Sequence, residues 1–69
     1  MALSNEEKIE IIQQHIKNIE YNVYNINISI LEENAVLVPN TTSIEALELQ
    51  LEDLNSKITV LNTELGKLQ

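Results

Sequence analysis

The feature that most constrains the fold is a pair of apolar stripes in which hydrophobic residues recur at alternating spacings of three and four positions. This spacing keeps side chains on one face of an α-helix and is the pattern of the a and d positions of a coiled coil. Strands would need alternation at every second residue, which neither stretch shows. The sequence therefore predicts two amphipathic helices. The stripes are Ile9, Ile12, Ile16, Ile19, Val23, Ile26 and Ile30, then Ile44, Leu47, Leu51, Leu54, Ile58, Leu61, Leu65 and Leu68.

Two capping signals mark where the helices begin. Ser4 followed by Glu7 matches a capping box, in which the hydroxyl accepts an early backbone N–H and the carboxylate reaches back. Thr42 followed by Glu45 matches a second one. The predicted bounds are a first helix over about 5–33, a linker over about 34–42 and a second helix over about 43–67, within a single helical-hairpin domain of residues 1–69.

The two stripes suit pairing with each other. In an antiparallel pair an a position faces a d position, and both Ile30 with Leu47 and Ile9 with Leu68 have residue numbers that add to 77. The ends of the stripes therefore coincide, and the linker is long enough to turn the chain. We expect an all-α fold, an antiparallel two-helix coiled-coil hairpin. Pro39 and the second capping box oppose the alternative of one long parallel coiled coil.

A second apolar stripe lies on the opposite face of the first helix, at Tyr21, Tyr24, Ile28, Leu31 and Ala35. Leu49 and the apolar linker extend this surface around the loop end of the hairpin. An exposed apolar patch on a small protein commonly marks an interface, and tyrosine is well suited to one. The candidate interface with a second copy or a partner comprises Tyr21, Tyr24, Ile28, Leu31, Val36, Leu37, Val38 and Leu49.

Size favours self-association. A two-helix hairpin of 69 residues has little core, and isoleucine at both a and d positions favours more than two strands. We expect a homo-oligomer, with a dimer of hairpins forming a four-helix bundle as the first choice and a larger helical oligomer as the next. The alternative is a monomer in which the second stripe packs under the linker.

The sequence contains little that could perform chemistry. It has no cysteine and a single histidine, His15, so neither a nucleophile triad nor a thiolate metal site can form. We expect no enzymatic activity, no catalytic residue, no bound metal and no cofactor. The carboxylates near the loop are interpreted as a solvated face, with a Mg²⁺- or Ca²⁺-binding module as a remote alternative. These carboxylates are Glu32, Glu33, Glu45, Glu48, Glu52 and Asp53.

Charge and hydropathy narrow the range of partners. Four lysines against eleven acidic residues argue against nucleic-acid binding and against anionic membranes. The longest apolar run, at 35–38, is far too short to span a membrane, and no signal peptide is visible, so we expect a cytoplasmic protein. The predicted function is a non-enzymatic, oligomerising interaction or assembly module. The alternative is a small regulator or inhibitor, of the kind that viruses and phages encode, that binds a cellular protein.

Overall fold

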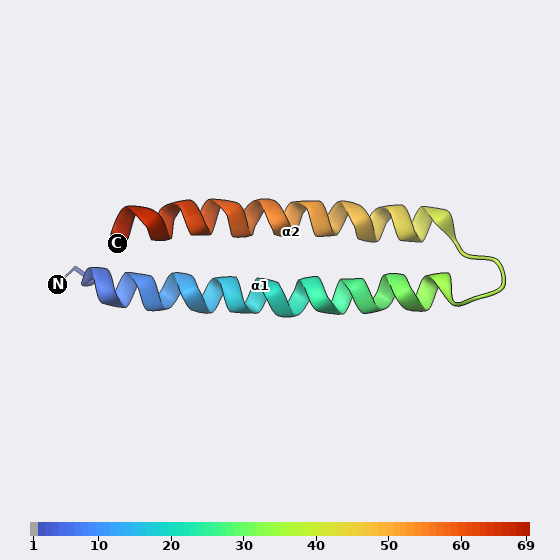
Figure 1. Cartoon of the computed structure of the whole chain (residues 1–69), viewed down its shortest axis with the longest axis horizontal. Coiled ribbons are helices and arrows are strands. Elements are labelled where there is room, and N and C mark those ends of the chain that lie inside the picture. The colour runs from blue at the N-terminus through green and yellow to red at the C-terminus, as the bar shows by residue number, and fades with distance from the viewer. Residues whose placement is uncertain (1) are drawn as a thin grey trace.

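The computed structural model describes residues 2–69, which form two helices and, within that range, no strand. Helix α1 spans Asn5–Asn34 and helix α2 spans Thr41–Leu68. The helices lie side by side and run in opposite directions, so that both termini lie at one end and the connection at the other (Figure 1). The result is a rod with dimensions of 57 × 18 × 15 Å. The predicted all-helical hairpin is confirmed.

The first capping box forms as predicted. The Ser4 Oγ accepts a hydrogen bond from the Glu7 backbone N–H at 3.1 Å, and the Glu7 Oε1 accepts one from the Ser4 N–H at 2.9 Å. Both bonds satisfy N–H groups that the first helical turn leaves without intrahelical partners. Hydrogen bonding to Ser4 lowers the pKa of the Glu7 carboxyl below its ordinary value. The bond with the Ser4 backbone has the larger effect and the bond with the Ser4 side chain the smaller one.

The predicted second capping box, at Thr42 and Glu45, does not form. Helix α2 begins two residues earlier than predicted, with Asn40 as its N-cap, and the Asn40 Oδ1 accepts a hydrogen bond from the Ser43 N–H at 3.1 Å. Asparagine is among the best N-cap residues, and Asn40 directly follows Pro39, which cannot donate a backbone hydrogen bond. Thr42 therefore lies inside the first turn, where its side chain no longer caps the helix.

The two predicted stripes form the contact between the helices. All fifteen stripe residues are half-buried, and no residue in the described chain is fully buried. The hairpin therefore has an apolar seam between two helices instead of an enclosed core. Its radius of gyration is 16.2 Å, whereas a compact globular chain of this length has about 11 Å.

Candidate interaction surfaces

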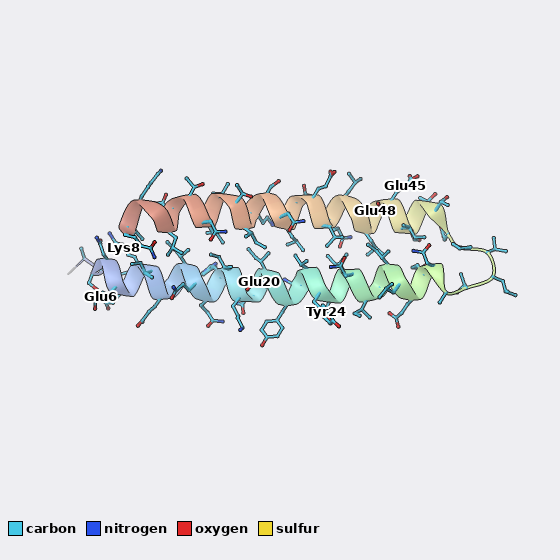
Figure 2. All side chains as sticks on the ribbon, in the orientation of Figure 1. Glu6, Lys8, Glu20, Tyr24, Glu45 and Glu48 are labelled. Carbon is cyan, nitrogen blue, oxygen red and sulfur yellow. The ribbon has the colours of Figure 1, made fainter. Side chains whose placement is uncertain are left out.

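The predicted outer stripe is exposed along α1. Tyr21, Tyr24 and Leu31 are each about two-thirds exposed, while Ile28 between them is half-buried. Tyr24 lies on the side of α1 away from α2 (Figure 2). Tyr21 and Tyr24 share a shallow hollow with Lys17, whose Nζ lies 6.0 Å from the centroid of the Tyr21 ring. The structure thus places these four predicted residues on one continuous face of α1.

The remaining predicted residues lie at the loop end. Leu37 and Val38 protrude from the connection with relative exposures of 102% and 86%, and Val36 is more than half exposed. Leu49 is on α2, in a separate hollow that it shares with Glu45, Glu48 and Glu52. Leu49 therefore has carboxylates as immediate neighbours.

A surface that sequence reasoning missed lies between the helices. We assign heptad letters to both helices, with Ile9 as an a position of α1 and Ile44 as an a position of α2. The residues at c and g positions of both helices are called the groove face. The residues at b, e and f positions are called the back face. Within residues 2–69, shallow grooves run between α1 and α2, and apart from Leu3 and Ser56 the lining residues of three of them occupy c, d and g positions. These three grooves therefore open on the groove face.

From one groove to the next along the rod, the residue numbers on the α1 side fall while those on the α2 side rise. One joins residues 22–26 of α1 to 50–57 of α2, the next joins 15–19 to 56–61, and the last joins 3–12 to 64–68. Residues of the two helices that lie level with each other thus have numbers that add to about 77.

The groove face is most apolar toward the termini. Val60 is 66% exposed and Ile11 is 47% exposed, and each lines a groove beside the half-buried residue that follows it in the sequence. His15 lines the same groove as Val60. The sequence signal was present, because Ile11 and Val60 occupy c positions that a two-stranded seam does not need.

Charge is distributed unequally around the rod. The groove face holds three lysines and three carboxylates, so its net charge is zero, whereas the back face holds seven glutamates and one lysine. Glu45, labelled in Figure 2, lies at the outer edge of α2. The back face would therefore repel a second copy of itself. The charged residues of the groove face are Lys8, Lys57, Lys67, Glu32, Asp53 and Glu64, and those of the back face are Lys17, Glu6, Glu7, Glu10, Glu20, Glu45, Glu48 and Glu52.

Charge is also unequal along the rod. We call residues 21–56 the loop half and the other residues the terminal half. The loop half carries six carboxylates and no lysine, whereas the terminal half carries five carboxylates and all four lysines. The rod is therefore strongly acidic at one end and nearly neutral at the other.

The polar side chains bond within their own helix. Ser29, Thr59 and Thr63 donate to the carbonyl four residues earlier, and Lys67 pairs with Glu64 across 3.5 Å on α2. Among residues 2–69, none of the side-chain hydrogen bonds or ion pairs joins α1 to α2. The helices are thus held together by their apolar stripes.

Two further properties concern metals and membranes. In the described part of the chain, no three acidic or histidine side chains are arranged to hold one metal ion. Neither α1 nor α2 has the combination of length and hydropathy that a membrane-spanning helix needs.

In comparisons with known proteins, no family model, no curated protein and no solved structure matches this chain.

Proposed function

We propose that this chain is a non-enzymatic assembly module that associates with further copies of itself through its helices. The observation that carries the proposal is that a well-formed hairpin leaves every described residue at least partly exposed. Its accessible surface is 5434 Å², whereas a typical folded monomer of 7.9 kDa exposes about 4,400 Å². The two-helix hairpin alone therefore leaves more surface in contact with water than a typical folded monomer of its mass.

The excess surface has the size of a protein interface. It amounts to roughly 1,000 Å² for each chain, and a standard interface buries about 800 Å² on each partner. Packing two hairpins into a four-helix bundle would turn the antiparallel coiled-coil seam of each into half of an enclosed core. A second copy is thus the occupant that the area and the stripe pattern favour.

Sedimentation equilibrium across the micromolar range tests this proposal. We expect a mass of at least twice 7.9 kDa together with high helix content in circular dichroism. A helical species that stays at 7.9 kDa at every concentration would overturn the proposal.

A second candidate function is the binding of another protein at the loop end. Leu37 and Val38 are almost fully exposed there, and six carboxylates lie in the same half of the rod. An apolar tip among acidic residues favours a partner that carries both apolar and basic side chains. A fluorescent amphipathic Leu/Lys peptide is the probe. We expect binding that weakens with salt and with Leu37→Asp, and equal binding by a Leu/Glu peptide would contradict this candidate.

A further inference from the structure

We infer that two hairpins pack groove face to groove face with their loops at opposite ends, so that each dimer presents two loop ends to other molecules. The inference rests on the proposed self-association and adds to it the surface and the orientation. Three observations carry it: the charge around the rod, the apolar grooves and the charge along the rod.

The charge around the rod selects the groove face. Two back faces in contact would bring seven glutamates of one copy against seven of the other, with one lysine on each side to offset them. Two groove faces in contact bring together surfaces of zero net charge. Because like charges in a desolvated interface are costly, the groove face is the one that a second copy can cover.

The distribution of exposed apolar side chains also selects the groove face as the dimer interface. The three grooves expose the edges of the inner stripes, among them Ile12, Ile19 and Leu61. Ile11 and Val60 flank the same grooves with about half or more of their surface in water. A second groove face would enclose these side chains and complete a four-helix core, whereas contact at the back face would leave the grooves open.

The charge along the rod selects the orientation. On the groove face the loop half carries Glu32 and Asp53 and no lysine, so loops at the same end would bring these carboxylates of one copy beside those of the other. Loops at opposite ends set each loop half beside a terminal half, which on this face carries three lysines and one glutamate. On the groove face, Lys8 of one copy then lies toward the half that holds Glu32 and Asp53 in the other.

This arrangement has a consequence for the outer stripe and the loop. The tyrosines and the protruding Leu37 stay outside the dimer interface, and the two loop ends lie at the two ends of the bundle. One dimer can therefore hold two partner molecules at once, which raises the apparent affinity for a multivalent target.

A matched pair of variants tests the surface. Val60 and Leu49 are both exposed aliphatic residues of α2, at 66% and 62%, and lie on the groove face and the back face respectively. We expect Val60→Lys to raise the Kd of the dimer at least about tenfold, because an ammonium group would meet an apolar groove. Leu49→Lys should leave the Kd within about twofold. The opposite ranking at unchanged helix content would overturn the groove face and leave self-association intact.

Spin labels test the orientation. The chain contains no cysteine, so Thr42→Cys near the loop and Gln69→Cys at the terminal end each give one label per copy. With loops at opposite ends, each singly labelled dimer should show a distance of about 40 Å, the length of α2 between the two labelled positions. A mixture of the two labelled variants should add a short distance. Distances of about 20 Å within each singly labelled dimer, two helix diameters, would show parallel hairpins and overturn the orientation.

Discussion

The inner and outer stripes of α1 have the same spacing and different surroundings. The inner stripe, from Ile9 to Ile30, is half-buried against α2 along its whole length, whereas the outer stripe keeps Tyr21, Tyr24 and Leu31 about two-thirds exposed. The three-four spacing places residues on one face of a helix in both cases. The difference teaches that spacing determines which face a residue occupies, while a matching stripe elsewhere in the chain determines whether that face is covered.

The largest expected effect comes from truncating one leucine in each environment on α2. Leu54 belongs to the inner stripe and Leu49 to the back face, where it is 62% exposed. We expect Leu54→Ala to lower the free energy of unfolding by about 2 kcal/mol and Leu49→Ala by less than about 0.5 kcal/mol. Urea unfolding followed by circular dichroism, at one fixed protein concentration, measures both. Equal losses would show that the two stripes are equally buried in solution.

The next largest effect on stability is expected at the N-cap of α2, just before the first residue of its inner stripe. Asn40→Ala removes the side chain that accepts from the Ser43 N–H, and we expect a loss of about 1 kcal/mol in the free energy of unfolding. Thr42→Ala is the control, since Thr42 lies inside the first turn, and should change stability by less than about 0.5 kcal/mol. A larger loss for Thr42→Ala than for Asn40→Ala would show that Thr42 caps the helix, as the sequence predicted, and that α2 begins closer to Ile44.

A smaller effect appears at the other end, where the capping box holds the turn before Ile9. The pKa of Glu7 is lowered, so its stabilising contribution is complete above the ordinary pKa of glutamate and is lost as the pH falls through the lowered value. An NMR titration should give a midpoint for Glu7 below the ordinary glutamate value, with faster amide exchange in the first turn at acid pH. Ser4→Ala should return the midpoint toward the ordinary value, and an unchanged midpoint would contradict the capping box.

The sequence predicts the hairpin well because each helix is indicated by residues close to one another in the sequence. The stripe spacing predicted two helices that face each other, and Ser4 with Glu7 predicted the start of α1. The start of α2 was missed because Asn40, Thr41 and Thr42 are all competent caps, and their competition is decided by the extended backbone after Pro39. The groove face was missed because Ile11 and Val60 are 49 positions apart and come to lie on one face of the hairpin only when the helices pair.

The smallest expected effect separates the two stripes most directly. Tyr24→Glu places a charge in the middle of the outer stripe, on the side of α1 away from α2 (Figure 2). If the outer stripe lies outside the dimer, the Kd should stay within about twofold and the free energy of unfolding within about 0.5 kcal/mol, because Tyr24 is already in contact with water. Ile11→Lys, on the same helix at the groove face, serves as the contrast and should dissociate the dimer. A monomer produced by Tyr24→Glu alone would instead assign self-association to the outer stripe, and the groove face would then be the surface left open for another protein.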